Sequence, residues 1–226
     1  MKKIFAAILS FSFIFQVQHV IGQEKLKEGK ITFEITLNNA EEMNDQMLAM
    51  MPKEMVVYFK NGKSRGEMDM MGGKIVSITD SKAGETITCM DIMGRKTAMK
   101  TTKEDAQKEK KDLGEYDVKI TDETKDIAGY KCKKALLTFK DKEDKASTSE
   151  IWFTNELEAS NSEKYSWKGI DGFMMEFAVD QKGMGMKFSC TEVKKQDVSN
   201  DLFNIPDGYT VMTQEEMMKQ YGGGGH

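Results

Sequence analysis

Hydrophobic and polar residues alternate along much of the chain, which is the pattern of β-strands with one buried face. From Ile31 to Leu37, apolar side chains occupy every second position, and threonine and glutamate occupy the others. Similar segments follow, divided by turn-forming pairs such as Asn61-Gly62, whose residues tolerate positive φ. The predicted strands span residues 31–37, 55–60, 65–71, 74–79, 85–92, 95–100, 116–120, 130–139, 149–154, 173–179 and 184–190. This pattern predicts a mainly β fold with an antiparallel meander.

The rhythm changes between residues 40 and 51, where methionines recur at helical spacing. Asn39, followed three residues later by Glu42, is typical of a helix start, and Pro52 ends the run. We therefore expect a short amphipathic helix over residues 40–51.

Two further segments carry helix-start signals. Thr101 and Glu104 are spaced as a capping box before a highly charged stretch, which predicts a short solvated helix or a loop over residues 101–111. Thr213 and Glu216 have the same spacing and predict a last short helix through Tyr221. Residues 155–168 show no regular pattern and are expected to be irregular.

The first 22 residues read as an export signal. Lys2 and Lys3 precede an apolar run over residues 4–15, and small residues near Gly22 form a cleavage site. The run is shorter than the about 20 apolar residues of a membrane span, and no cysteine follows that would carry a lipid anchor. We predict a cleaved signal peptide over 1–22, a single β-rich domain over 23–221, a flexible glycine-rich tail over 222–226, and a periplasmic or secreted protein without a transmembrane segment.

Charge and histidine content narrow the possible functions. The net charge is −4 at pH 7 with both signs interspersed, whereas proteins that bind nucleic acid concentrate Lys and Arg on one face. The two histidines are His19, inside the predicted signal, and His226, the last residue. Their positions exclude Ser-His-Asp and Cys-His nucleophiles and the common zinc sites from the mature domain. We therefore predict a protein that is not an enzyme, with no catalytic residue, metal ligand, cofactor or nucleic-acid partner.

Carboxylates inside predicted strands are the remaining catalytic candidates. Asp69, Asp91 and Glu176 lie among apolar residues, where burial would raise the pKa of a carboxyl group. The alternative is that they face solvent on alternating strands, and we prefer it because no paired motif accompanies them.

Cys89, Cys132 and Cys190 allow at most one disulfide within a monomer. No C-x-x-C pair indicates redox chemistry, so one structural bridge or three buried thiols are the readings that we favour. If a bridge forms, we expect Cys132 with Cys190, because Cys190 shares a strand face with Phe188 and Met186.

Four segments in the second half of the chain resemble a bacterial family of unknown activity, the GLPGLI proteins and their relatives. Residues 127–135, IAGYKCKKA, resemble the strand I-x-G-Y-x-C-x-K-A, and residues 152–154, WFT, resemble the strand that follows it. Residues 169–174, GIDGFM, fall where the family carries its hexapeptide, with both glycines matching and Asp171 in place of proline. Residues 203–209, FNIPDGY, are similar to the ending of envelope carriers with the LolA/LolB-like fold.

This resemblance implies a curved antiparallel sheet that forms a half-open barrel, with short helices as a lid over its mouth. In LolA/LolB-like carriers the concave face holds the acyl chains of lipoproteins. On this basis we expect residues 40–51 to supply the lid.

Methionine is the compositional oddity, with 19 residues. Methionines fill irregular cores, and they also line surfaces that adapt to varied apolar partners. We predict a binding module for a lipid or other apolar ligand, or for an envelope protein. The expected lining is Met43, Met47, Met50, Phe173, Met175, Phe177, Met184, Met186 and Phe188.

Two alternatives to this binding function stay open. In the first, the protein is a structural or interaction module whose own helix fills the concave face. In the second, it binds Cu(I) through thioether pairs such as Met184 with Met186, or Met68 with Met70.

Overall fold

Antiparallel pairing between strands that follow each other in sequence builds most of the sheet. The computed structural model describes residues 24–38, 40–112, 115–140, 146–181, 184–213 and 216. Within these residues, twelve strands form one sheet in the order β12-β6-β5-β4-β3-β2-β1-β11-β10-β9-β8-β7. Only two pairings in this order join strands distant in sequence: β1 with β11, antiparallel, and β12 with β6, parallel.

The strands are, in order, β1 (Glu28–Leu37), β2 (Glu54–Lys60), β3 (Lys63–Met70), β4 (Gly73–Asp80), β5 (Glu85–Ile92), β6 (Arg95–Thr102), β7 (Glu115–Ile127), β8 (Tyr130–Lys140), β9 (Ala146–Thr154), β10 (Phe173–Gln181), β11 (Met184–Lys195) and β12 (Thr210–Thr213). The helices are the α-helices α1 (Asp45–Met50) and α2 (Lys103–Asp112) and the 3-10 helices η1 (Ala40–Glu42), η2 (Glu163–Tyr165) and η3 (Asn200–Phe203).

Tight hairpins connect the strands of the meander. Asn61 and Gly62, between β2 and β3, have φ angles of 51° and 83°, as the sequence predicts for a two-residue turn. Met93-Gly94 and Ala128-Gly129 have the same left-handed pair of conformations, at the β5–β6 and β7–β8 turns. Short turns fix the register, so consecutive strands pair along most of their length.

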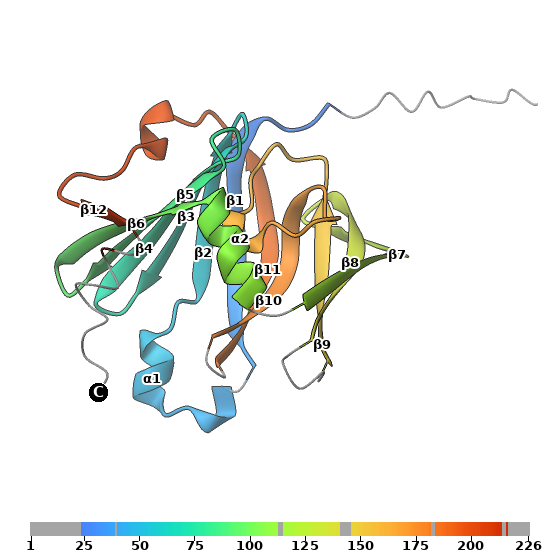
Figure 1. Ribbon diagram of the computed structural model, residues 1–226, viewed down its shortest axis with the longest axis horizontal. Helices are drawn as coiled ribbons and strands as arrows, with labels where there is room; N and C mark the ends of the chain where they lie inside the picture. Colours follow the sequence, from blue (N-terminus) through green and yellow to red (C-terminus); the bar gives the residue numbers. More distant parts are fainter. Residues whose placement is uncertain are drawn as a thin grey trace, which may run out of the picture.

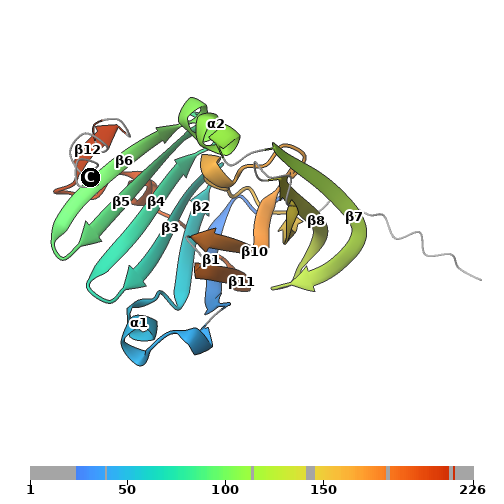
Figure 2. The ribbon, with the colours of Figure 1, turned by 60° about the horizontal axis from the view of Figure 1, so that its bottom comes forward.

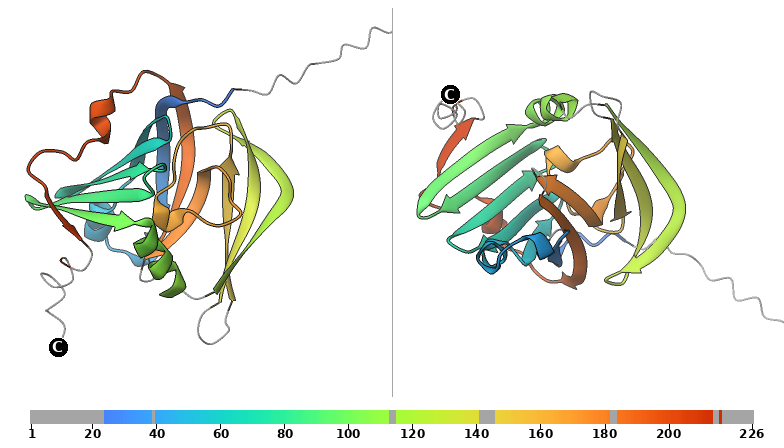
Figure 3. Two further views of the ribbon diagram at one scale, coloured as in Figure 1. Left: turned by 45° about the horizontal axis from the view of Figure 1, so that its top comes forward. Right: turned by 90° about the horizontal axis from the view of Figure 1, so that it is seen from below.

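The sheet curves into an open gutter with two walls (Figure 1). Strands β2 to β6 and β12 form one wall, β7 to β9 form the other, and β1, β10 and β11 lie between them (Figures 2 and 3). The predicted class is thereby confirmed: the described chain is mainly β, with a curved, half-open sheet.

The main hydrophobic core lies inside the curve. Its members come from strands at the base of the gutter, and Ile31, Phe33, Phe59 and Met175 are fully buried there. A second cluster lies along β8 and β9 of the second wall and the neighbouring strand β10, around Phe153 and Trp167. Burial of alternate residues on these strands is the physical reason for the apolar periodicity in the sequence.

A third cluster lies on the outer face of the other wall. Val76, Ile78, Cys89 and Ala98 are buried there, and partly buried residues after β11 pack against them. Those residues, Phe203, Ile205 and Tyr209, precede β12. The C-terminal part of the described chain therefore covers apolar residues that the meander turns away from the gutter.

The open side of the gutter holds residues 155–172, which we call the crossing segment (Figure 3). This segment connects β9 to β10 and contains η2, against which α2 packs. Leu157 forms a bridge with Leu26, and Lys164 lies 3.6 Å from a carboxylate oxygen of Glu109 on α2. The cover of the gutter consists of these residues, not of residues 40–51.

The helix predicted over residues 40–51 is shorter and lies elsewhere. Helix α1 begins after Asn44, whose side chain accepts a hydrogen bond from the Met47 backbone N–H at 2.8 Å. None of its described residues is buried, and it lies at the rim of the gutter beside β2 (Figure 1). The expected lid position is therefore wrong: α1 has only six residues, and its methionines Met47 and Met50 are exposed and not packed against the sheet.

The capping box of α2 lies one residue later than the sequence predicts. Thr102 and Asp105 form it: the Thr102 N–H donates to Asp105 Oδ2 at 2.9 Å, and the Asp105 N–H donates to Thr102 Oγ1 at 3.2 Å. Both threonines belong to β6, but the Thr101 side chain is buried whereas Thr102 is half-buried at the end of the strand, so Thr102 and not Thr101 is free to cap the helix.

Some predictions fall on residues outside the description. They concern the export signal over 1–22, the helix beyond Glu216, and the tail over 222–226. The capping box of that last helix is present, with Thr213 Oγ1 donating to Glu216 Oε2 at 3.0 Å. Among the described helices, none has the length and hydropathy needed to cross a membrane.

Candidate functional site

A pocket with a volume of about 190 Å³ lies inside the gutter, enclosed by the first wall, the base and the crossing segment. The first wall contributes residues from β2, β3 and β4, the base contributes residues from β1, β10 and β11, and the crossing segment closes one side. The lining residues are Phe33, Met55, Val57, Ser64, Gly66, Met68, Ser77, Thr79, Ser160, Asn161, Ser162, Tyr165, Phe173, Met174, Phe177, Val179, Met186 and Phe188.

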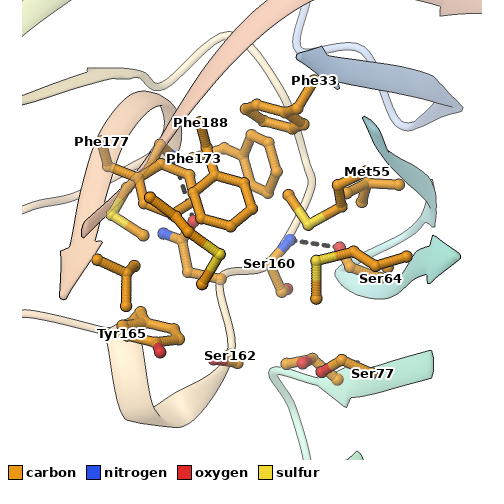
Figure 4. A pocket seen from close by; sticks show the side chains of 18 residues that line it. Phe33, Met55, Ser64, Ser77, Ser160, Ser162, Tyr165, Phe173, Phe177 and Phe188 are labelled. Atoms are coloured by element: carbon orange, nitrogen blue, oxygen red, sulfur yellow. Dashed lines mark hydrogen bonds between the residues drawn. The ribbon is translucent and has the colours of Figure 1, made fainter. Parts of the chain in front are cut away.

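Phenylalanine rings form the apolar part of the lining (Figure 4). Phe177 and Phe188 are stacked, with ring centroids 4.9 Å apart and planes 7° apart. Phe33 lies 6.1 Å from both Phe173 and Phe177, centroid to centroid, in tilted and edge-on arrangements. Each ring is held by its neighbours, so this aromatic part of the lining is already formed without a ligand.

Methionines border the rings. Met55, Met68 and Met186 line the pocket and are only partly buried, unlike Phe33 at the base. An unbranched thioether side chain changes rotamer at low cost, so these three residues can adjust the width of the pocket.

Hydrogen bonds position the crossing segment against the first wall and the base of the gutter. The Ser160 N–H donates to Ser64 Oγ at 2.7 Å, and the Glu163 N–H donates to Thr86 Oγ1 at 3.2 Å. On the other side, the Asn161 side chain donates to the Gly172 carbonyl at 2.8 Å and accepts from the Met174 N–H at 3.1 Å. The crossing segment has no strand ladder, and hydrogen bonds between side chains and backbone groups hold it in place instead.

The structure brings together four of the nine predicted lining residues. Phe173, Phe177, Met186 and Phe188 all line the pocket, as alternation along β10 and β11 predicts. Met175 does not, although it shares their alternation in sequence. A β-bulge between Met174 and Glu176 shifts the register, and Met175 is fully buried in the main core.

The other predicted lining residues lie elsewhere. Met47 and Met50 are 43% and 47% exposed on α1, and Met43 precedes that helix; none of the three contributes to the pocket. The side chain of Met184 lies outside the described residues.

Sequence reasoning missed most of the polar lining. Alternation in β1 and β2 signals Phe33, Met55 and Val57, because each occupies the buried face of a predicted strand. Ser162 and Tyr165 carry no such signal, since they belong to a segment without periodicity. Their place in the pocket is set by tertiary contacts of the crossing segment.

The three cysteines are buried free thiols, so the predicted disulfide is not formed in the structure. Cys132 and Cys190 do belong to the same core cluster, as that prediction requires. Burial raises the pKa of Cys132 to about 11 and that of Cys190 to about 12. Neither thiol has the lowered pKa of a reactive cysteine.

The carboxylates singled out in the sequence do not form a catalytic pair. Asp69 is exposed, and Glu176 is bound by Lys125 at 3.0 Å and Lys187 at 3.3 Å. Within the described residues, no cluster of three His, Cys, Asp or Glu side chains is placed to hold a metal ion. The proposed Cu(I) pair, Met184 with Met186, stays a prediction because it depends on the undescribed Met184 side chain.

Comparison with solved structures finds proteins of similar shape at low scores. LprF from Mycobacterium bovis has 10% identity and a TM-score of 0.31, covering 76% of this chain and 88% of LprF. MucB has 11% identity and a TM-score of 0.34, with 82% of this chain and 59% of MucB covered. A beta-barrel-like protein of the domain of unknown function DUF1849 from Brucella abortus has 9% identity and a TM-score of 0.34, with 77% and 100% covered.

Comparison with curated proteins finds no match. The resemblance to the GLPGLI proteins and to LolA/LolB-like carriers stays a prediction. A family is nevertheless found for the larger part of the chain. Residues 84–213, more than half of the sequence, match the family described as N-glycanase peptide, N-terminal domain, and the chain belongs to this family.

Proposed function

We propose that the protein is a non-enzymatic binding module whose gutter takes up a lipid-like or other apolar ligand. The observation that carries the proposal is the pocket itself, in which a preformed wall of phenylalanines faces adjustable methionines. Ligand sites are typically concave and mostly apolar, with a few polar groups that set orientation.

The lining argues for binding and against catalysis. None of the described lining residues is an aspartate, glutamate, lysine, histidine or cysteine. Serine, threonine and tyrosine do line the pocket, but a hydroxyl nucleophile needs an adjacent base to activate it, and no described lining residue supplies one. For this reason we do not extend the activity in the family's name to this chain.

The volume sets the size of the occupant. An apolar cavity of about 150 Å³ admits benzene, and sites for drug-sized ligands measure about 300–1,000 Å³. At about 190 Å³, the pocket accepts a short apolar group, and movement of Met55, Met68 or Met186 enlarges it for longer ones.

The proposal includes export. If residues 1–22 are removed as a signal peptide, the domain works in the periplasm or outside the cell, where its ligand or an envelope protein would meet it. N-terminal sequencing of the protein recovered from its host tests this part, with a chain beginning at Gln23 as the expected result.

Dye binding with a pocket-filling variant tests the binding function. Gly66 lines the pocket, and a Cβ there meets only Met55 Sδ and Val57 Cγ2, each at 3.9 Å. Leucine at this position should therefore enter the cavity. Wild-type protein should bind N-phenyl-1-naphthylamine, an uncharged apolar dye, and Gly66→Leu should bind it at least about 10-fold more weakly, the loss expected when one apolar side chain's worth of contact is removed.

Ser147→Leu is the matched control, because it adds the same side chain at an exposed position of β9. It should bind the dye like the wild type. Mass spectrometry of organic extracts from protein purified out of its own envelope gives a second measurement. Absence of both bound lipid and dye binding would refute the proposal.

The residues that already fill much of the gutter favour a second function, that of a structural or interaction module. The crossing segment and the buried residues at the base occupy much of the concave face, so a structural or interaction module that needs no ligand is the alternative. In that case Gly66→Leu would leave partner binding unchanged, and extracts would contain no ligand.

A further inference from the structure

One side of the pocket carries three hydroxyl groups that make no hydrogen bond to any other described residue: those of Ser77, Ser162 and Tyr165. Ser162 directly precedes η2, yet its side chain makes no capping bond. Figure 4 shows these side chains on the side opposite the phenylalanine rings. All three residues are half-buried. Their hydroxyl oxygens are not among the fully buried polar atoms that lack a hydrogen-bond partner, so they are accessible.

The neighbouring polar groups have structural partners instead. Ser160 Oγ donates to the Gly62 carbonyl at 2.6 Å, and Ser64 Oγ accepts from the Ser160 N–H. Asn161 uses both ends of its amide within the protein. The protein's own architecture therefore accounts for these groups, and it leaves the hydroxyls of Ser77, Ser162 and Tyr165 available to a ligand.

The pocket offers no charge to a ligand. All eighteen described lining residues are neutral. The carboxylate of Glu67, whose sequence neighbours Gly66 and Met68 line the pocket, is held by Arg65 at 2.5 Å and Lys74 at 2.8 Å. An ionised group loses its hydration on entering such a pocket and gains no countercharge, which disfavours it strongly.

We infer that the ligand is a short, uncharged amphiphile with a hydroxyl-bearing head, such as a monoacylglycerol. Its head meets Ser77, Ser162 and Tyr165, and its apolar chain lies against the stacked rings of Phe177 and Phe188. This inference rests on the proposed binding function and specifies the chemical class of the ligand.

The pocket volume sets the chain length for the test. Scaling from the about 150 Å³ that admits the six carbons of benzene, a pocket of about 190 Å³ takes roughly eight carbons. An eight-carbon chain therefore fills it, and the head group and the larger dye need the room that movement of Met55, Met68 or Met186 adds. Three amphiphiles with the same eight-carbon chain separate the effect of the head: 1-octanoylglycerol is neutral, octanoate is an anion at pH 7.5, and octylamine is a cation.

The experiment measures displacement of N-phenyl-1-naphthylamine from the full chain by each compound. We expect 1-octanoylglycerol to bind at least 10-fold more tightly than octanoate or octylamine. In the Ser77→Ala/Tyr165→Phe variant, affinity for 1-octanoylglycerol should fall about 5- to 100-fold, the range that two lost hydrogen bonds give, while affinity for the dye stays unchanged.

Tyr58→Phe is the matched control, because Tyr58 on β2 loses the same hydroxyl outside the pocket. It should leave every affinity unchanged. Octanoate or octylamine binding as tightly as the ester would overturn the inference, as would an ester preference that survives the double substitution. The comparison among the three compounds uses wild-type protein, so it holds even if the variant folds poorly.

The two proposals fail in different ways. If the dye binds and the three heads are not distinguished, the binding function stands and the neutral-head inference is wrong. If neither the dye nor any amphiphile binds, both are wrong.

Discussion

At the scale of single residues, buried thiols are the groups whose chemistry the fold changes most. Cys132 and Cys190 are held inside the gutter, where their Sγ atoms donate to the carbonyls of Tyr130 at 3.5 Å and Glu192 at 3.7 Å. Burial disfavours the thiolate, so the pKa of both thiols lies above the ordinary value near 9.

This burial predicts a stability loss at high pH under reducing conditions. Above pH 9 the unfolded chain loses thiol protons that the folded chain keeps up to about pH 11 at Cys132 and about pH 12 at Cys190. The unfolded state then binds fewer protons, so the free energy of unfolding falls as pH rises. Urea denaturation between pH 7 and pH 10.5 should show a shallower fall for Cys132→Ala/Cys190→Ala than for the wild type.

The control for that series is Ile31→Val, a fully buried residue of the same cluster. It should cost about 0.5–1.5 kcal/mol at every pH, because it deletes one methylene and no titrating group. Equal slopes for the double variant and the wild type would show that the thiols do not carry the effect.

At the scale of elements, helix α2 depends on an N-terminal cap that also lowers the pKa of Asp105. Thr102 donates to Asp105 through both its N–H and its hydroxyl, and these bonds lower the pKa of the Asp105 carboxyl group. The helix has little apolar surface, with charged residues in most positions, so its ends matter for its stability.

Thr102→Ala should lower the free energy of unfolding by about 1 kcal/mol near pH 7, the usual cost of a lost N-cap. Because the pKa of Asp105 is lowered, the cap contributes fully above the unfolded pKa near 3.8, and its contribution disappears as pH falls through the folded value. Glu104→Ala, at the position that sequence spacing alone assigns to the box, should change the free energy of unfolding by less than about 0.5 kcal/mol. Thermal denaturation would contradict this prediction if the two variants were equally destabilised at pH 7, or if the difference between them did not shrink from pH 7 to pH 3.

The crossing segment is the second element whose position decides the site. Asn161 joins it to the start of β10 through both ends of its amide. Asn161→Ala should cost about 1–3 kcal/mol, since two partly buried backbone groups lose their partners. It should also speed hydrogen exchange in residues 155–172. Asn155→Ala, an exposed asparagine in the same segment, is the control and should leave exchange unchanged.

At the scale of the whole molecule, the two walls are stabilised separately. The wall of β2 to β6 and β12 has its own outer cluster, covered by Phe203, Ile205 and Tyr209, whereas the wall of β7 to β9 packs, with the neighbouring strand β10, around Trp167. The walls meet through the base of the gutter and the crossing segment.

Phe203→Ala should therefore loosen one wall selectively. The substitution exposes the cluster around Val76 and Cys89, and we expect a loss of roughly 1–3 kcal/mol for this partly buried ring, below the full cost of a core phenylalanine. Hydrogen exchange should rise in β5 and β6 and stay unchanged in β7 and β8. A uniform rise across both walls would show that they unfold as one unit.

Strand positions were predictable because alternation is local. The segment predicted over 85–92 is β5 (Glu85–Ile92) itself, and Asn61-Gly62 forms the expected turn. The helix over 40–51 was overestimated, because the methionine spacing that predicts an apolar face does not show whether any surface lies opposite that face. Strand β12 was missed: its four residues pair in parallel with β6, and a contact between distant segments leaves little periodicity in the sequence.

The sequence by itself determined a mainly β fold, its hairpins, the aromatic residues of β10 and β11, and the absence of histidine between His19 and His226. These properties follow from side-chain periodicity, turn chemistry and composition, which act over a few residues. Tertiary structure alone decided that residues 155–172 and not residues 40–51 cover the gutter, that a bulge removes Met175 from the pocket, and that Ser77, Ser162 and Tyr165 converge there. The physical reason is that an irregular segment is placed by long-range hydrogen bonds and packing, which no local pattern encodes.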